Sequence, residues 1–392
     1  TQHQGMDRIL PFLEDQVGGT CYKSYKYCFD EREVPTLKYE ENQSYTLQKD
    51  RYGETDTSLK TTKDISYTSK QICCNKPLFS YFLDGSRRIY KIDDLELVRK
   101  IFPIIGGQIG VACCERKNPS TFKKALLEHN LVLSLPSEAD KDGRNSDQFF
   151  KSITQKINDL PKLSQYNLKF SKILVYPSKS LDPGEKFENL GIAKIQDEMI
   201  DCEKIIVAEL VKKNLLNQDN YLLKDGSLQY KPMKSGDFRE LSKLKSNYRC
   251  VVGLSKHFNP ELSKDKLGKS NATKIAKLPL YHRTPAFMYQ TDIVSTEVHF
   301  CIWYLRIRDV KYTESPFSGV VKVEKVLVTE DEIENGLNSD EVDLISANII
   351  NERNPVAYGS DSRWANHLYP VYLTERYVKS QYISDLHFLN LF

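Results

Sequence analysis

The stretch Leu78-Phe79-Ser80-Tyr81-Phe82-Leu83-Asp84-Gly85-Ser86 predicts the central strand of this protein. Its apolar and aromatic run is typical of a buried β-strand, and the Asp-Gly pair predicts that the strand ends there in a turn. The same Asp-Gly-Ser tripeptide occurs at residues 225–227, after another apolar run. We therefore expect two strands that carry Asp84 and Asp225 to one edge of a sheet, although two purely structural turns would explain the same pattern.

A helix is predicted at about residues 193–216, because apolar side chains recur on one arc at about 100° per residue. Glu203 interrupts that arc, since the positions three and four residues away on both sides are all apolar. Its carboxylate should therefore point toward the sheet. A buried, unpaired charge costs several kcal/mol, so such an acid needs a cation, a metal or a raised pKa. Two interpretations stay open, a metal ligand or a buried ion pair with Arg249 or Lys256.

The expected order of elements is the Asp84 strand, a hairpin formed by residues 87–92 and 104–114, the Glu203 helix and the Asp225 strand. Ribonuclease-H-like nucleases assemble their metal-binding carboxylates in this order. The predicted fold is therefore α/β, a ribonuclease-H-like mixed sheet flanked by helices. A helix is expected at 119–129, within an insertion at 118–190 between the third strand and the first core helix. A C-terminal strand and helix extension follows.

In more detail the chain resembles the NurA family of DNA-repair nucleases. The resemblance depends on short pieces in a shared order, which are residues 83–86, Glu203, 223–228, 251–256, 321–324 and Tyr369-Pro370. It implies a nuclease domain at 71–392 and leaves 1–70 as an N-terminal lead-in and assembly segment. The family has a histidine shortly after its Tyr-Pro pair, where this chain has Tyr377. Tyr377 could replace that histidine, His367 could supply it, or its role could be absent.

The resemblance implies a metal-dependent DNA nuclease, of exonuclease and single-strand endonuclease type, with Asp84, Glu203 and Asp225 as metal ligands. Two divalent ions can generate a hydroxide and stabilise the leaving oxygen of a phosphodiester, and oxygen ligands favour Mg²⁺ or Mn²⁺. Lys256 is expected to contact a phosphate. Tyr369 is expected to contact a phosphate or a base, and its alternative is core packing.

The same resemblance implies a homodimer that works on DNA with a hexameric HerA-type ATPase, in repair or phage defence. The alternative function is a catalytically weakened or inactive DNA-binding adaptor subunit of such a complex. The intact carboxylate set favours the nuclease, and Tyr377 in place of the histidine favours the adaptor.

Composition restricts the function classes further. The net charge of the 392 residues is +3, but residues 231–283 hold thirteen Lys or Arg against four Asp or Glu. This segment predicts either a path for phosphates or an ordinary solvated surface. No apolar run approaches the ~20 residues of a membrane span, and no cleavable signal is visible, so we expect a cytoplasmic protein without membrane contact. Nine cysteines without a Cys-x-x-Cys pair disfavour a zinc or disulfide framework.

Overall fold

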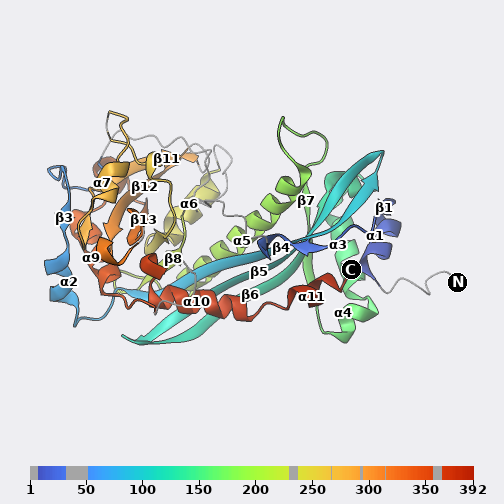
Figure 1. The fold of residues 1–392 in the computed structure, drawn as a ribbon, viewed down its shortest axis with the longest axis horizontal. Coiled ribbons are helices and arrows are strands. Elements are labelled where there is room, and N and C mark those ends of the chain that lie inside the picture. The colour runs from blue at the N-terminus through green and yellow to red at the C-terminus, as the bar shows by residue number, and fades with distance from the viewer. Residues whose placement is uncertain are drawn as a thin grey trace.

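The strands of the described chain form one mixed sheet with helices on both faces (Figure 1). The computed structural model describes residues 8–31, 52–228, 237–265, 267–291, 295–313, 315–355 and 364–392. Across the sheet the order is β3-β10-β12-β13-β9-β8-β4-β5-β6-β7, while β1 and β2 pair with β4 and β11 pairs with β12. The predicted α/β class, with a mixed sheet flanked by helices, is confirmed.

Three long antiparallel strands run across the middle of the molecule (Figure 1). They are β4 (Phe79–Leu97), β5 (Lys100–Asn118) and β6 (Thr121–Pro136). Val98 and Arg99 connect the first two with φ values of 48° and 63°, the left-handed values that a two-residue hairpin turn requires. On its other side β4 pairs in parallel with β8 (Tyr221–Asp225), which pairs in parallel with β9 (Val251–Ser255). The start of β4 is therefore flanked by the antiparallel β5 on one side and by the parallel β8 on the other.

Three sequence predictions for this region are wrong. The strand that contains Asp84 does not turn at Gly85, because Gly85 pairs with Val111 in a ladder that continues to Leu97. Residues 119–129 are not a helix, since most of them belong to β6 and pair with β5. A short run with few apolar residues fits both the helix period of 3.6 residues and the strand period of 2 residues. The pairing with β5 decides between them. Residues 118–136 are therefore not part of an insertion.

The segment between β6 and the Glu203 helix contains α3 (Ser146–Asn158), α4 (Pro161–Gln165) and β7 (Phe170–Tyr176). Because β7 pairs in parallel with β6, this segment extends the sheet by one strand at its edge.

Two sets of helices cover opposite faces of the long strands. The predicted Glu203 helix is confirmed as α5 (Phe187–Lys212), and the other face carries α10 (Tyr369–Ser380) and α11 (Asp385–Leu389). A Cβ at Gly107 of β5 would lie 3.0 Å from Ile195 of α5, and a Cβ at Gly110 would lie 2.6 Å from Val378 of α10. Side chains alternate between the faces of a strand, so these two glycines let one helix approach from each side.

The remaining elements pack at the two ends of the long strands (Figure 1). The first group is α1 (Ile9–Val17), β1 (Thr20–Cys21) and β2 (Tyr27–Cys28). The second group is β3 (Lys63–Asp64), α2 (Ser66–Ile72), α6 (Phe238–Asn247), α7 (Ala272–Ala276), β10 (His282–Arg283), β11 (Phe287–Thr291), β12 (Ser295–Arg306), β13 (Val320–Leu327), α8 (Glu330–Asn335) and α9 (Ser339–Asn351). The predicted C-terminal strand and helix extension is confirmed by β12, β13, α8 and α9.

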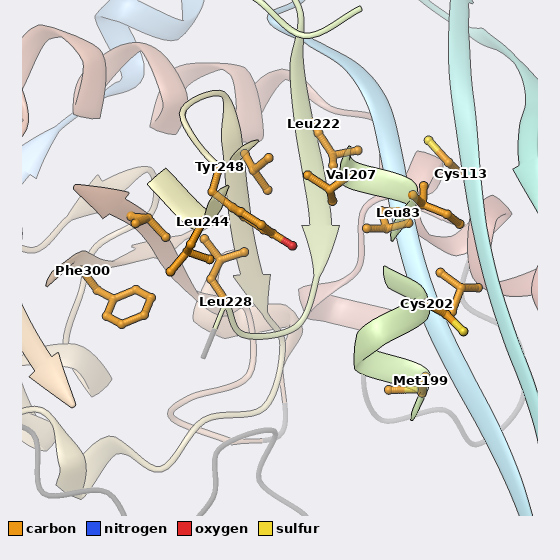
Figure 2. Close-up of a cluster of buried hydrophobic side chains, with 14 of the residues drawn as sticks. Leu83, Cys113, Met199, Cys202, Val207, Leu222, Leu228, Leu244, Tyr248 and Phe300 are labelled. Carbon is orange, nitrogen blue, oxygen red and sulfur yellow. The ribbon is translucent and has the colours of Figure 1, made fainter. Parts of the chain in front are cut away.

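A continuous apolar core packs α5 against β8. Figure 2 shows Val207 of α5 beside Leu222 of β8, and Leu244 of α6 beside Leu228, three residues after β8 ends. Side chains of this size each contribute roughly 1.5–3 kcal/mol when fully buried. This packing sets the position of α5, and therefore of Glu203, relative to Asp225. Among the described helices, none has the length and apolar character needed to cross a membrane.

A candidate metal centre

Four carboxylates from four separate segments line one pocket of about 330 Å³. Asp84 comes from β4, Glu203 from α5, Asp225 from the last position of β8 and Glu375 from α10. β8 stops there because Gly226 turns the chain with a φ of 93°, whereas β4 continues alongside. Residues of α5 and α10, which cover opposite faces of the sheet, both line the space beyond the end of β8.

Three of these acids lie close enough to share one ion. One oxygen from each of Asp84, Asp225 and Glu375 lies within 4.8 Å of the other two. Asp84 and Glu375 are buried, and the side chain of Asp225 is 11% exposed. Oδ1 of Asp225 is buried and accepts no hydrogen bond from the residues that the structure describes. Mg²⁺, Mn²⁺ and Ca²⁺ bind carboxylate oxygens, so the cluster could bind a metal ion.

Two buried lysines compensate part of the negative charge. Nζ of Lys256, just after β9, lies 2.6 Å from Oδ2 of Asp225 and 3.9 Å from Oε2 of Glu375. Nζ of Lys224 lies 3.4 Å from Oε2 of Glu203. Glu203 is therefore paired, but with neither of the two cations expected from sequence. Because side chains alternate along β8, Lys224 points away from the Asp225 face and toward α5.

Burial and mutual repulsion act strongly on the acids of this pocket. Burial, followed by the negative charge of Asp225, raises the pKa of Asp84 well above its usual value, while Lys256 opposes the rise. Burial also raises the pKa of Glu203, which Lys224 partly offsets. Groups with such pKa values favour a proton or a cation nearby, because the free charge is poorly solvated. A divalent cation would supply that compensation for several acids at once.

Gly85 makes the approach of Glu203 possible. A Cβ at this position would lie 2.2 Å from Oε1 of Glu203, closer than real Cβ contacts occur. The backbone of Gly85 is not left-handed and lies inside β4. The glycine after Asp84 therefore leaves space for a carboxylate and does not form the turn predicted from the sequence.

Glu375 is the site residue that sequence reasoning missed. It lies on α10 with Val371 four positions before it and Val378 three positions after it, and all three are buried. This matches the pattern around Glu203 only in part, because the position four residues after Glu375 is Lys379, so the test that singled out Glu203 does not single out Glu375. Glu375 did not stand out in the sequence because the residues directly before and after it are polar.

The structure places His367 and Tyr377, the two residues considered for the role of the expected histidine. Nε2 of His367 lies 3.1 Å from Oε2 of Glu375, and the imidazole is buried. The ring of Tyr377 instead lies 4.3 Å from Nζ of Lys124. Of the two residues, His367 is therefore the one that contacts the carboxylate cluster.

Tyr369 does not line the pocket. It begins α10, and its ring packs edge-on against Phe122 at 6.2 Å and under the guanidinium of Arg353 at 4.9 Å. These contacts correspond to the packing interpretation of this residue.

The basic segment 231–283 contributes fewer surface charges than its sequence suggests. Lys231, Lys234 and Lys266 lie outside the described residues. Lys256 is buried in the candidate site, and Arg283 is buried in ion pairs with Glu54 and Asp343. Two of its thirteen cations therefore neutralise the protein's own acids and cannot contact phosphates on the surface.

The fold and the pocket define a mixed α/β protein with a buried carboxylate cluster suited to a metal ion. No protein-family model matches the chain, and no curated protein was found to be similar to it.

Proposed function

We propose that this protein is a metal-dependent nuclease that hydrolyses phosphodiester bonds in DNA. The observation that carries the proposal is the convergence of Asp84, Asp225 and Glu375 within 4.8 Å, together with the buried Oδ1 of Asp225, which has no hydrogen-bond partner in the described part of the chain. Three hard oxygen ligands from separate elements are what Mg²⁺ or Mn²⁺ requires in a nuclease of this chemistry.

The strand order supports a ribonuclease-H-like core of the NurA type. Three antiparallel strands in the order β6-β5-β4 are followed by the parallel strands β8 and β9, and α5 connects the two groups along the chain. This is the arrangement that the resemblance to ribonuclease-H-like nucleases implies. It brings the acids of β4, α5 and β8 together in the order expected from the sequence.

Five charged residues of the site have a role in this proposal. Asp84, Asp225 and Glu375 hold the first cation, and Glu203 in the same pocket is available to a second. A bound divalent cation would lower the pKa of a coordinated water and stabilise negative charge on the leaving oxygen. Lys256 balances the charge of Asp225 and Glu375 and adds positive potential where charge develops on the phosphate.

At about 330 Å³ the pocket lies in the size range of small-ligand sites, so it can hold a phosphodiester group of a strand. Assembly as a homodimer and action with a hexameric HerA-type ATPase, in repair or phage defence, complete the proposal and rest on the family resemblance.

A DNA-binding adaptor is the second candidate function. The observation that favours it is the ion pairing of Lys256 with Asp225 and Glu375, which offsets part of the cluster's charge without any metal. In an adaptor this pairing would be permanent, and divalent ions would neither bind the pocket nor stabilise the fold.

Metal titration and cleavage assays distinguish the two functions. Calorimetry with MnCl₂ and MgCl₂ measures ion binding, and end-labelled single-stranded and duplex DNA report cleavage with and without the partner ATPase. Asp225→Asn should abolish metal binding and cleavage while DNA binding stays intact, since a carboxylate ligand becomes a neutral amide. Asp219→Asn is the matched control, because Asp219 is exposed in the loop before β8. Wild-type protein that binds neither ion and cleaves none of the DNA substrates would support the adaptor.

A further inference from the structure

Lys379 is the exposed cation at the mouth of the carboxylate pocket. It lies one turn after Glu375 on α10, and its Nζ is 2.6 Å from Oε1 of that residue. Its side chain is 50% exposed, whereas Lys224, the other lysine that lines the pocket, is 6% exposed. Lys379 therefore contacts both Glu375 of the carboxylate cluster and the solvent from which a substrate would arrive.

The buried lysines are committed to the protein itself. Nζ of Lys224 lies beside Glu203 and donates hydrogen bonds to the backbone carbonyls of Asp225 and Ser227, at 3.1 and 3.0 Å. These contacts use the three donors of an ammonium group. Lys379 donates to Glu375, and no second acceptor for it occurs among the residues that the structure describes. It can therefore donate to an incoming ligand without leaving Glu375.

The pocket needs such a cation before an anion can enter. Its lining contains four carboxylates and two lysines, and Lys256 lies beside Asp225 and Glu375, so the formal charge of the site is −1 when all are ionised. A phosphodiester adds one more negative charge. Ammonium groups bind phosphate oxygens as point charges, without the planar geometry that arginine requires.

We propose that Lys379 binds a non-bridging oxygen of the substrate phosphodiester at the pocket mouth. The inference rests on the proposed function in so far as the ligand is a nucleic-acid strand. Lys379 contacts the sugar-phosphate backbone of the strand and not a base, so it binds strands of any base sequence equally. The geometry thereby assigns a substrate-binding residue on α10, an element that also contributes Glu375.

The test compares Lys379→Gln, Lys379→Arg and a matched control in metal-free buffer with EDTA, where no cleavage occurs. Lys213→Gln is the control, because Lys213 forms the same i,i+4 pair with Glu209 at 2.5 Å and is 55% exposed at the C-cap of α5, outside the pocket. Fluorescence anisotropy with labelled single-stranded DNA of mixed sequence, at several salt concentrations, measures affinity. Calorimetry with MnCl₂ shows whether the carboxylates still bind a cation.

Lys379→Gln should weaken DNA binding about threefold to tenfold at 50 mM salt and reduce the slope of log affinity against log salt by about 0.7, the value for one phosphate contact on a single strand. Lys379→Arg should retain both, and every variant should still bind Mn²⁺ through the carboxylates. Equal DNA affinity and salt slope for Lys379→Gln and Lys213→Gln would overturn the inference, as would wild-type protein that binds no DNA. Wild-type protein that binds DNA through Lys379 but never cleaves it would instead refute the nuclease and leave this inference standing.

Discussion

Replacing Gly85 with alanine directly probes how Glu203 reaches the pocket. The new Cβ would lie 2.2 Å from Oε1 of Glu203, 3.0 Å from Cδ and 3.1 Å from Cγ. The overlap falls on one side chain and not on backbone. Because the backbone of Gly85 is not left-handed, β4 itself accommodates alanine. The expected consequence is a displaced Glu203 carboxylate in an otherwise intact sheet.

The size of the displacement follows from these contacts. Ordinary Cβ contacts begin at 3.4 Å, so Oε1 has to move by about 1 Å. A shift of this size in a catalytic group costs about 10²-fold in rate. It also disturbs the 3.4 Å contact between Glu203 and Lys224. The overpacking itself should cost no more than about 1–3 kcal/mol of unfolding free energy.

The assay is the single-turnover cleavage rate at saturating Mn²⁺, together with urea denaturation. Gly107→Ala is the matched control, because its Cβ would press on Ile195 of the same helix, α5, at 3.0 Å and away from the pocket. It should lower stability without lowering the cleavage rate. Gly85→Ala should lower the rate far more than the control does.

A second substitution makes this prediction sharper. Glu203→Asp withdraws the carboxylate by one methylene group, about 1.5 Å, and removes the overlap with alanine. The double variant should therefore lose less activity than the product of the two single losses, with a coupling of about 0.5–3 kcal/mol. An unimpaired Gly85→Ala variant, or strictly additive losses, would refute the position assigned to Glu203.

Two further predictions concern pH and stability. Asp84→Asn should stabilise the metal-free protein by about 1–3 kcal/mol at pH 8. The pKa of Asp84 is raised in the folded protein, so folding retains a proton that the unfolded chain releases. The stability of the wild-type protein therefore falls as pH rises through the folded pKa. Urea denaturation in EDTA measures this, and a destabilised Asn variant would contradict it. Burial raises the pKa of Glu352 to about 7 although Arg116 opposes the shift. Stability should therefore decrease by at most about 3 kcal/mol between pH 4.5 and 7, and a pH series in which Glu352→Gln keeps the full slope would exclude this origin.

Much of the fold could be predicted because it depends on local periodicity. Apolar spacing along α5 identified both the helix and the inward direction of Glu203, and the apolar run before Gly226 identified β8 and its end at Asp225. The same reasoning failed at Gly85, where the identical Asp-Gly-Ser tripeptide lies inside a strand. Backbone conformation at that position depends on the ladder with β5 and on the space that Glu203 occupies.

By itself the sequence determined which side chains are buried along α5 and along the apolar runs that lead to Asp84 and Asp225, because a repeat of 3.6 or 2 residues is set by backbone geometry within one element. It thereby identified Asp84, Glu203 and Asp225. Only the tertiary structure decided that Glu375 joins Asp84 and Asp225 and that Lys224 is the partner of Glu203. These contacts join elements far apart in the chain, and their formation depends on strand pairing and helix packing over the whole sheet.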